Sequence, residues 1–233
     1  MCAVTEVLTV GRDLDADAAF ALHTACFGDT REWFDAFLDA AAGQQYLAAM
    51  HRGKLCGGAF LLDACLFVNR KEYKGKYAYA LGVSPAYRGQ GIARMLLDAA
   101  KELSSHFTLI CAADEKLAKT YEKHGFDRYV GGTVQVGAAR GVQMDTSAYK
   151  TPCTYADAVQ CGGVFLGEKL FAFALEECGA ALYTDGKSVI VKSAGGVYAA
   201  YGLPAAVERK AQMHVKKEID TSSIHADLIL EVE

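Results

Sequence analysis

The chain has 233 residues and a formal net charge of −4, with 52% hydrophobic and 22% charged residues. This length fits one large domain, or a medium domain with a smaller one, of globular composition. The acidic balance, with no basic run longer than Lys216-Lys217, argues against a nucleic-acid binder. The eight cysteines form no CxxC pair and have no histidine at zinc-finger spacing, so we expect reduced thiols in a cytoplasmic protein without a metal. Signal-peptide features and a run of about 20 apolar residues are absent, so no membrane contact is expected.

The first 130 residues predict alternating strands and helices. Hydrophobic periodicity and turn residues give the order β-α-α-β-β-β-α-β-α-β, which implies a mixed α/β sheet. The expected segments are a strand over 6–10, helices over 13–27 and 29–42, strands over 45–51, 55–68 and 77–83, a helix from 92, a strand over 107–112, a helix over 114–124 and a strand from 126. Residues 69–76 are charged and are expected to form a turn.

Helix caps and a strand pattern add detail to these segments. Asp13 or Asp15 is expected to cap the first helix, and Asp29 and Glu32 have capping-box spacing at the start of the second. Alternation in the strand 77–83 predicts one face of large and one of small side chains, which are Tyr77, Tyr79, Leu81 and Val83 against Ala78, Ala80 and Gly82. The face of small side chains leaves room for a ligand along the strand. The helix from 92 is expected to bury Ile92, Met95 or Leu96, Ala99 and Leu103.

The remaining residues predict a smaller α+β region. We expect a hairpin of 133–136 with 142–144, a helix over 167–178, a hairpin of 181–184 with 188–192, a helix over 205–213 and a strand over 226–232. The order of helix and then hairpin repeats the layout around Arg52-Gly53-Lys54. We therefore divide the chain into 1–146 and 147–233, the second region being a candidate partial repeat of the first.

A glycine-containing loop, Arg88-Gly89-Gln90-Gly91-Ile92-Ala93, joins the strand 77–83 to the next helix. Helix starts expose N–H groups without intrahelical acceptors and carry partial positive charge. Such a site suits a pyrophosphate, and Gly89 and Gly91 would let the backbone approach it closely. The loop alone also fits a nucleotide-binding protein of another fold.

Two motifs together resemble the GCN5-related N-acetyltransferase (GNAT) superfamily. The pattern Arg88-x-x-Gly91-x-Ala93, preceded by Val83-Ser84-Pro85, resembles its acetyl-CoA signature, and LAKTYEKHGF over 117–126 resembles its Tyr-Glu-Lys-x-Gly-Phe segment. The resemblance covers about residues 5–145. It implies a mixed, centrally splayed sheet flanked by helices. It also implies acetyl-CoA as the acyl donor, no metal, and direct attack by a primary amine.

The resemblance also assigns roles to individual residues. Backbone groups of Leu81, Gly82 and Val83 would pair with the pantetheine arm as an added strand does. The pyrophosphate would be held by the amides of Arg88, Gly89, Gln90, Gly91, Ile92 and Ala93. Tyr121 matches the general acid that protonates the departing thiolate. Asp114 stands where the family often has Asn, so it keeps an acceptor near the cofactor but loses the amide donor.

The motifs leave the general base open. Many family members carry a carboxylate on the strand before the phosphate loop, and 77–83 has none. The candidates are His23, Asp63, Glu72, a water chain and the carboxylate of the terminal Glu233. The missing carboxylate also keeps a non-catalytic acyl-CoA sensor or scaffold as an alternative. The acceptor is expected to be a small-molecule or peptide amine, and 147–233 to complete its pocket or form a homodimer contact.

Overall fold

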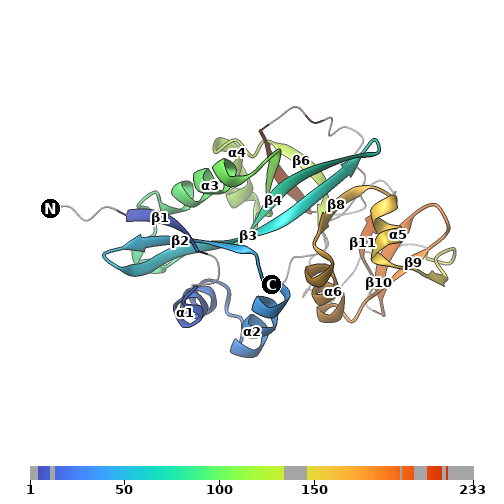
Figure 1. Cartoon of the computed structure of the whole chain (residues 1–233), viewed down its shortest axis with the longest axis horizontal. Coiled ribbons are helices and arrows are strands. Elements are labelled where there is room, and N and C mark those ends of the chain that lie inside the picture. The colour runs from blue at the N-terminus through green and yellow to red at the C-terminus, as the bar shows by residue number, and fades with distance from the viewer. Residues whose placement is uncertain are drawn as a thin grey trace.

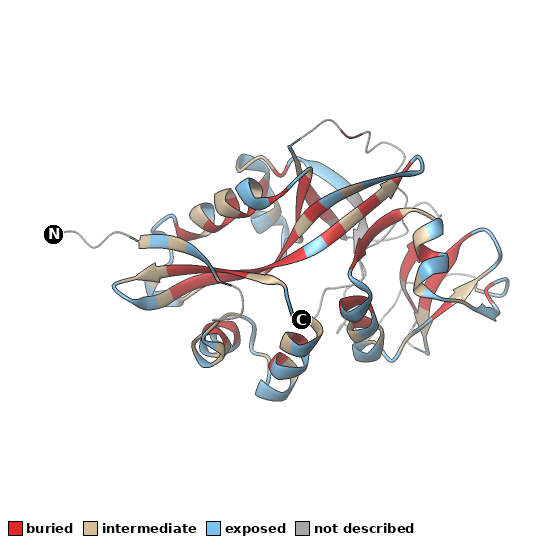
Figure 2. Cartoon of the chain, in the orientation of Figure 1, coloured by how far each residue is buried: buried red, intermediate tan, exposed pale blue. Residues whose placement is uncertain are grey.

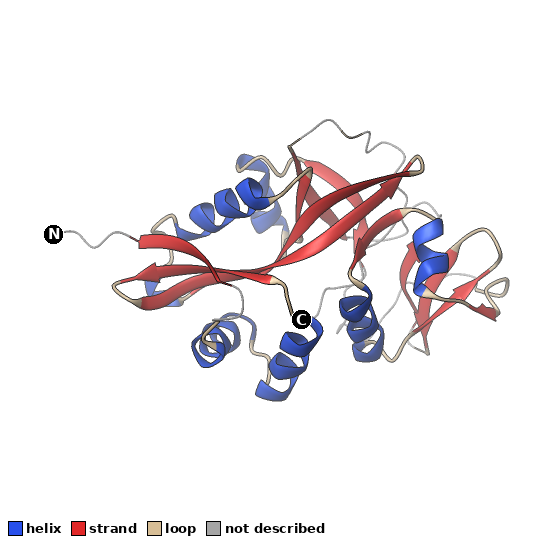
Figure 3. Ribbon diagram, in the orientation of Figure 1, coloured by secondary structure: helices blue, strands red, loops and turns tan. Residues whose placement is uncertain are grey.

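The structure is a computed structural model, and it describes residues 5–10, 14–133, 146–194, 196–201, 209–216 and 219. These residues form a large mixed sheet of eight strands and a second sheet of four. Helices α3 and α4 lie on one face of the large sheet, and α1 and α2 lie on the other (Figures 1 and 3). None of the described helices is long and apolar enough to cross a bilayer.

The large sheet has the order β1-β2-β3-β4-β5-β12-β6, and β8 also pairs with β3. Its strands are β1 (Thr5–Val10), β2 (Gln45–His51), β3 (Lys54–Val68), β4 (Lys71–Val83), β5 (Phe107–Ile110), β6 (Arg128–Thr133), β8 (Gly163–Leu166) and β12 (Arg209–Val215). Its helices are α1 (Ala16–Phe27), α2 (Arg31–Ala40), the short 3-10 helix η1 (Pro85–Tyr87), α3 (Ile92–Leu103) and α4 (Glu115–Lys123). The predicted α/β class and the order of elements up to β6 are confirmed.

The second sheet has the order β11-β10-β9-β7 and is accompanied by two helices. Its elements are β7 (Thr151–Pro152), α5 (Tyr155–Gln160), α6 (Glu168–Glu177), β9 (Ala181–Thr184), β10 (Val189–Ser193) and β11 (Gly196–Tyr201). The predicted helix over 167–178 and the hairpin after it are confirmed. The predicted hairpin around 137–141 and the strand over 226–232 lie outside the described residues.

The caps of α1 and α2 decide where two acidic side chains point. Asp15 caps α1 by accepting the backbone N–H of Ala18 at 3.0 Å, as expected. The predicted capping box of Asp29 and Glu32 is wrong. Because α2 begins at Arg31, Thr30 takes the cap position and its hydroxyl accepts the N–H of Trp33 at 3.3 Å. The Asp29 carboxylate is therefore released from the cap.

The β3–β4 hairpin is longer than the sequence predicted. The expected turn over 69–76 is wrong, because β4 begins at Lys71 and pairs with β3 from there onward. Only Asn69 and Arg70 form the turn, with φ of 51° and 59°. Positive φ at both central residues is typical of the tight turns that match strand twist. The charged side chains do not prevent pairing, and Lys76 binds the Asp63 carboxylate at 2.7 Å.

A β-bulge interrupts β4 near its C-terminal end. The β3–β4 register shifts between Gly58 and Phe60, and Ala80 has a φ of 50°. Tyr77 and Tyr79 pack into the core under α1 and α2, whereas the next large side chains, Leu81 and Val83, pack into the core under α3. The predicted single face of large side chains is therefore wrong, because a bulge adds one residue and exchanges the faces.

The amphipathic face of α3 differs slightly from the prediction. Its buried residues are Ile92, Leu96, Leu97 and Ala100. Ile92 and Leu96 are confirmed, and Ala99 is half-buried against the same core. The prediction that Leu103 is buried is wrong, since this residue is 41% exposed at the last turn of the helix.

The predicted helix over 205–213 is wrong from Arg209 onward, where the structure has strand β12. Its described part, from Arg209, is extended and lies antiparallel between β5 and β6. Ala211, Gln212 and Met213 are all buried, because the strand has neighbours on both edges and cover on both faces. This tertiary setting outweighs the local preference read from the sequence.

The C-terminal region shares a core with the first. β8 pairs with β3, and Phe173 of α6 contacts the rings of Trp33 and Phe37 on α2. The buried positions run along the strands of both sheets (Figure 2). The division at residues 146 and 147 and the partial repeat stay predictions, although β12 places residues from beyond that point in the large sheet.

Candidate active site

A cavity of about 400 Å³ opens where β4 and β5 separate. The two strands are parallel, and among the described residues their pairing joins only Lys76 to Thr108 and Tyr77 to Leu109. Beyond these pairs the cavity is lined from four sides, by α1 and the loop after it, by β4, by the end of β5 and by α4. This is the central splay that the resemblance implied.

The loop between β4 and α3 has the geometry of an anion cradle. Gly89 and Gly91 have φ of 77° and 80°, a conformation that favours glycine, and a Cβ at either would meet nothing within 4 Å. Gly91 occupies the cap position of α3 without any side-chain cap bond. The first N–H groups of α3 are therefore not covered by a capping side chain. Arg88 folds back, its Nε donating to the Val83 carbonyl at 3.1 Å.

The predicted pantetheine residues lie at the end of β4. Gly82 and Val83 pair with Gly58 and Gly57 of β3 through one edge of the strand, and Leu81 lines the cavity. A Cβ on Gly82 would lie 2.9 Å from the Cys26 sulfur, so α1 packs directly on this glycine.

Tyr121 reaches the cavity from α4. Its side chain is only 7% exposed, and burial, with smaller contributions from Cys111 and Asp114, raises its pKa to about 12. The phenol is therefore protonated at neutral pH and can donate. Asp114 caps α4 by accepting the N–H of Leu117 at 2.7 Å, so its carboxylate is engaged by the helix.

His23 and Asp29 form a buried pair on the opposite side of the same cavity. The His23 Nε2 and Asp29 Oδ2 atoms lie 2.7 Å apart, and the side chains are 5% and 14% exposed. Burial lowers the pKa of His23, while the hydrogen bond and charge of Asp29 partly oppose this shift. The imidazole is stacked on Trp33 and tilted against Phe34, with ring centroids 5.6 and 5.1 Å away.

The other predicted bases are placed elsewhere. Asp63 binds Lys76, and Glu72 accepts from the Cys65 thiol on the far part of the β3–β4 hairpin. Neither is among the residues that line the cavity. Glu233 lies outside the described residues.

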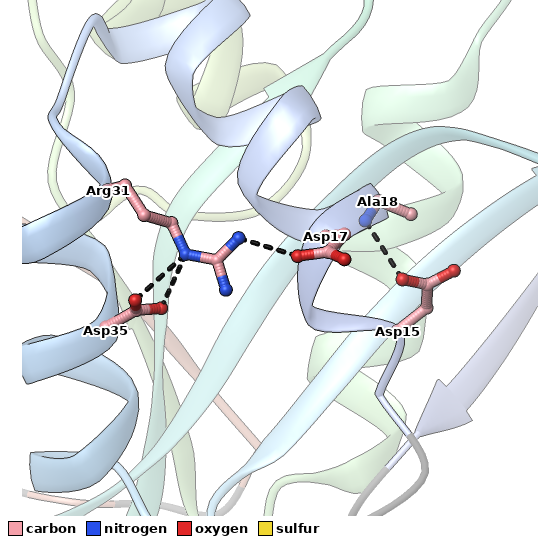
Figure 4. Close-up of polar contacts among 5 residues, drawn as sticks. All are labelled: Asp15, Asp17, Ala18, Arg31 and Asp35. Carbon is pink, nitrogen blue, oxygen red and sulfur yellow. Dashed lines mark hydrogen bonds and ion pairs between the residues drawn. The ribbon is translucent and has the colours of Figure 1, made fainter.

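An ion-pair cluster joins the first turns of α1 and α2 (Figure 4). Arg31 places one guanidinium nitrogen 2.6 Å from Asp17, and its Nε donates to both oxygens of Asp35 at 2.8 and 2.9 Å. These carboxylates hold the pKa of Arg31 well above its usual range. The cluster links α1, which carries His23, to α2, which follows the loop with Asp29, and the sequence did not predict it.

Side chains of strand β12 bind the backbone of the segment that carries Tyr121. Gln212 donates to the carbonyls of Ala118 at 2.9 Å and Phe126 at 3.0 Å, and His214 lies 2.9 Å from the Gly125 carbonyl. The sequence gives no signal for these contacts, since Gln212 lies 86 and 94 residues from its partners.

A known family model matches the part of the chain that holds most of the candidate site. Residues 42–128 match the family model of the acetyltransferase (GNAT) domain. This range contains β4, the glycine loop, α3 and α4 with Tyr121. This part of the chain is similar to a GNAT acetyltransferase domain, which confirms the predicted resemblance.

Solved structures show the same fold over most of the chain. They include a GCN5-related N-acetyltransferase from Kribbella flavida, with a TM-score of 0.54 and 14% identity over 83% of this chain and 56% of that one. Eis1 from Mycobacterium abscessus has a TM-score of 0.52 and 16% identity over 80% and 53%. A probable N-acyltransferase of unknown function from Enterococcus faecalis has a TM-score of 0.51 and 14% identity over 84% and 54%. The chain thus spans about half the length of these structures, and no curated protein matches it.

Proposed function

We propose that the protein transfers an acetyl group from acetyl-CoA to a primary amine by direct attack. The observation that carries this proposal is the cavity between the separated strands, with Leu81 of β4 and Tyr121 of α4 in its lining. The cradle at the start of α3 supports it, because a GNAT domain needs a pyrophosphate site near the splayed strand.

The donor would lie along the end of β4. Backbone groups of Leu81, Gly82 and Val83 would pair with the pantetheine arm, and the amides of residues 88–93 would hold the pyrophosphate. Strand N–H groups aimed at the thioester carbonyl would stabilise its developing negative charge, with about 3 kcal/mol per donor. The Asp114 carboxylate, which caps α4, contributes to this site through the position of the helix.

Tyr121 would assist departure of the thiolate. The acceptor nitrogen bonds to the thioester carbon, the carbon–sulfur bond breaks, and the electron pair leaves on sulfur. The buried phenol remains protonated at neutral pH, so it can donate to that sulfur as charge develops.

The acceptor would be a small-molecule or peptide amine with an apolar body. Aromatic and aliphatic side chains line most of the cavity, and its one carboxylate among the described residues, Asp29, is engaged by His23. These features do not favour an acceptor with several positive charges. No described residue beyond 146 lines the cavity, so a pocket completed by the C-terminal region stays a prediction. A homodimer and a cytoplasmic location also stay predictions.

A coenzyme A release assay over a panel of primary amines tests the proposal. We expect Tyr121→Phe to lower kcat by about 10²-fold or more, because the sulfur loses its donor. The thermal stabilisation by acetyl-CoA should remain, and Tyr129→Phe on β6 serves as the control. Unchanged turnover would remove Tyr121 from the mechanism. Stabilisation by acetyl-CoA with no release from any amine would favour the sensor or scaffold.

A further inference from the structure

We propose that the His23–Asp29 pair is the general base that removes the proton from the acceptor amine. The inference rests on the proposed acetyl transfer and names the group that the GNAT motifs leave open. His23 lies on α1, Asp29 follows the end of that helix, and both line the cavity that Tyr121 enters from α4. The cavity therefore has a proton acceptor and a proton donor on different elements.

Asp29 fixes which imidazole nitrogen is available. Its carboxylate, released from the cap of α2 by Thr30, accepts the Nε2–H of His23 at 2.7 Å. A carboxylate bound to one ring nitrogen holds the tautomer in which the other carries the lone pair. Nδ1 is then the basic atom, and Asp29 stabilises the imidazolium that forms. Burial keeps the imidazole neutral at neutral pH, as a base must be.

A purely structural role accounts less well for the pair. The imidazole lies among the rings of Phe27, Trp33 and Phe34, where an apolar side chain would pack without a polar partner. Burying a carboxylate beside it adds a desolvation cost. Among the described lining residues, Asp29 is the only carboxylate and His23 the only imidazole.

Two protons move during the proposed transfer. As the amine lone pair bonds to the thioester carbon, an N–H proton of the acceptor passes to Nδ1 of His23. The carbon–sulfur pair leaves on sulfur, which receives a proton from Tyr121. The imidazolium then loses its proton through solvent and the tyrosinate regains one, so both groups return to their starting states.

The ionisable groups that face the cavity with His23 are few. Those in the described lining are Cys26 on the same helix, Asp29, Tyr77 and Tyr79 on β4, Cys111 after β5 and Tyr121 on α4. Helix α2 presents the uncharged rings of Trp33 and Phe34. Thiols and phenols ordinarily ionise well above neutral pH and carboxyls well below it. A loss of rate between pH 7 and 5, beyond the loss that comes from protonation of the acceptor amine, would therefore report His23.

The test compares His23→Gln with wild type by coenzyme A release, using an amine acceptor found in the panel. We expect kcat/KM, calculated on the concentration of unprotonated acceptor amine, to fall by about 10²-fold and the acid limb of its pH profile to disappear. Thermal stabilisation by acetyl-CoA should persist. His51→Gln is the matched control, since His51 bonds Thr5 on β1 and does not line the cavity.

The outcomes separate this inference from the proposed function. A wild-type enzyme that transfers acetyl, with His23→Gln equal to it in rate and pH profile, overturns only the base. Acetyl-CoA binding without transfer to any amine overturns both. If His23→Gln does not fold, the wild-type imidazole is titrated by NMR beside Asp29→Asn. The pKa of His23 should equal that of the acid limb and fall in Asp29→Asn, and a mismatch overturns the assignment.

Discussion

At the scale of single residues, burial couples the protonation of His23 to folding. Its folded-state pKa is lowered, so below the ordinary value of about 6.5 the unfolded chain binds a proton that the folded chain resists. The free energy of unfolding therefore falls as pH drops through that range and is unaffected above it. Between pH 7.5 and 5.5 this contribution is at most about 1.4 kcal/mol. Urea unfolding at both pH values should show a smaller loss in His23→Gln, and an equal loss in both proteins would contradict the coupling.

The sequence motifs predicted Tyr121 and the glycine loop as parts of the site, but they did not predict the contact between His23 and Asp29. The two motifs are local, with glycine φ values and a helix cap that depend on near neighbours. Asp29 could either cap α2 or bind a side chain of the preceding helix. In the structure Thr30 takes the cap position, and Asp29 binds His23 of α1.

At the scale of elements, the start of α2 sets the position of Asp29. Thr30→Ala removes the hydroxyl that accepts the Trp33 N–H, and loss of such a cap costs about 1 kcal/mol. We expect that loss in denaturant unfolding, together with weaker acetyl transfer, because Asp29 becomes free to cap the helix. Thr30→Ser, which keeps the hydroxyl, is the control. A stability loss in Thr30→Ser as large as in Thr30→Ala would show that the cap bond is not the cause.

Elements with one local pattern were predicted better than those shaped by neighbours. The predicted helix over 114–124 corresponds to α4, in which Asp114 caps the start and Gly125, with a φ of 85°, follows the end. The bulge at Ala80 did not, since its positive φ is imposed by the β3–β4 register and not favoured by alanine. The prediction of which side chains share a face of β4 was therefore wrong, although the strand itself was confirmed.

At the scale of the whole molecule, β12 connects the C-terminal region to α4, the helix that carries Tyr121. The strand is inserted between β5 and β6, and pairing between segments so far apart along the chain has no local sequence signal. Its buried Gln212 binds carbonyls on both sides of Tyr121, one in α4 and one after it. The C-terminal region would thus act on catalysis by holding α4 and not by lining the cavity.

Gln212→Leu tests this long-range support. The substitution keeps a side chain of similar size but leaves the buried Phe126 carbonyl without its side-chain donor, which costs about 1–3 kcal/mol. We expect lower stability in denaturant unfolding, and a lower kcat with little change in stabilisation by acetyl-CoA, because the cradle lies on α3. Lys210→Gln, in the same strand, is the control. If Gln212→Leu lost stability but kept the wild-type kcat, β12 would support the fold without positioning Tyr121.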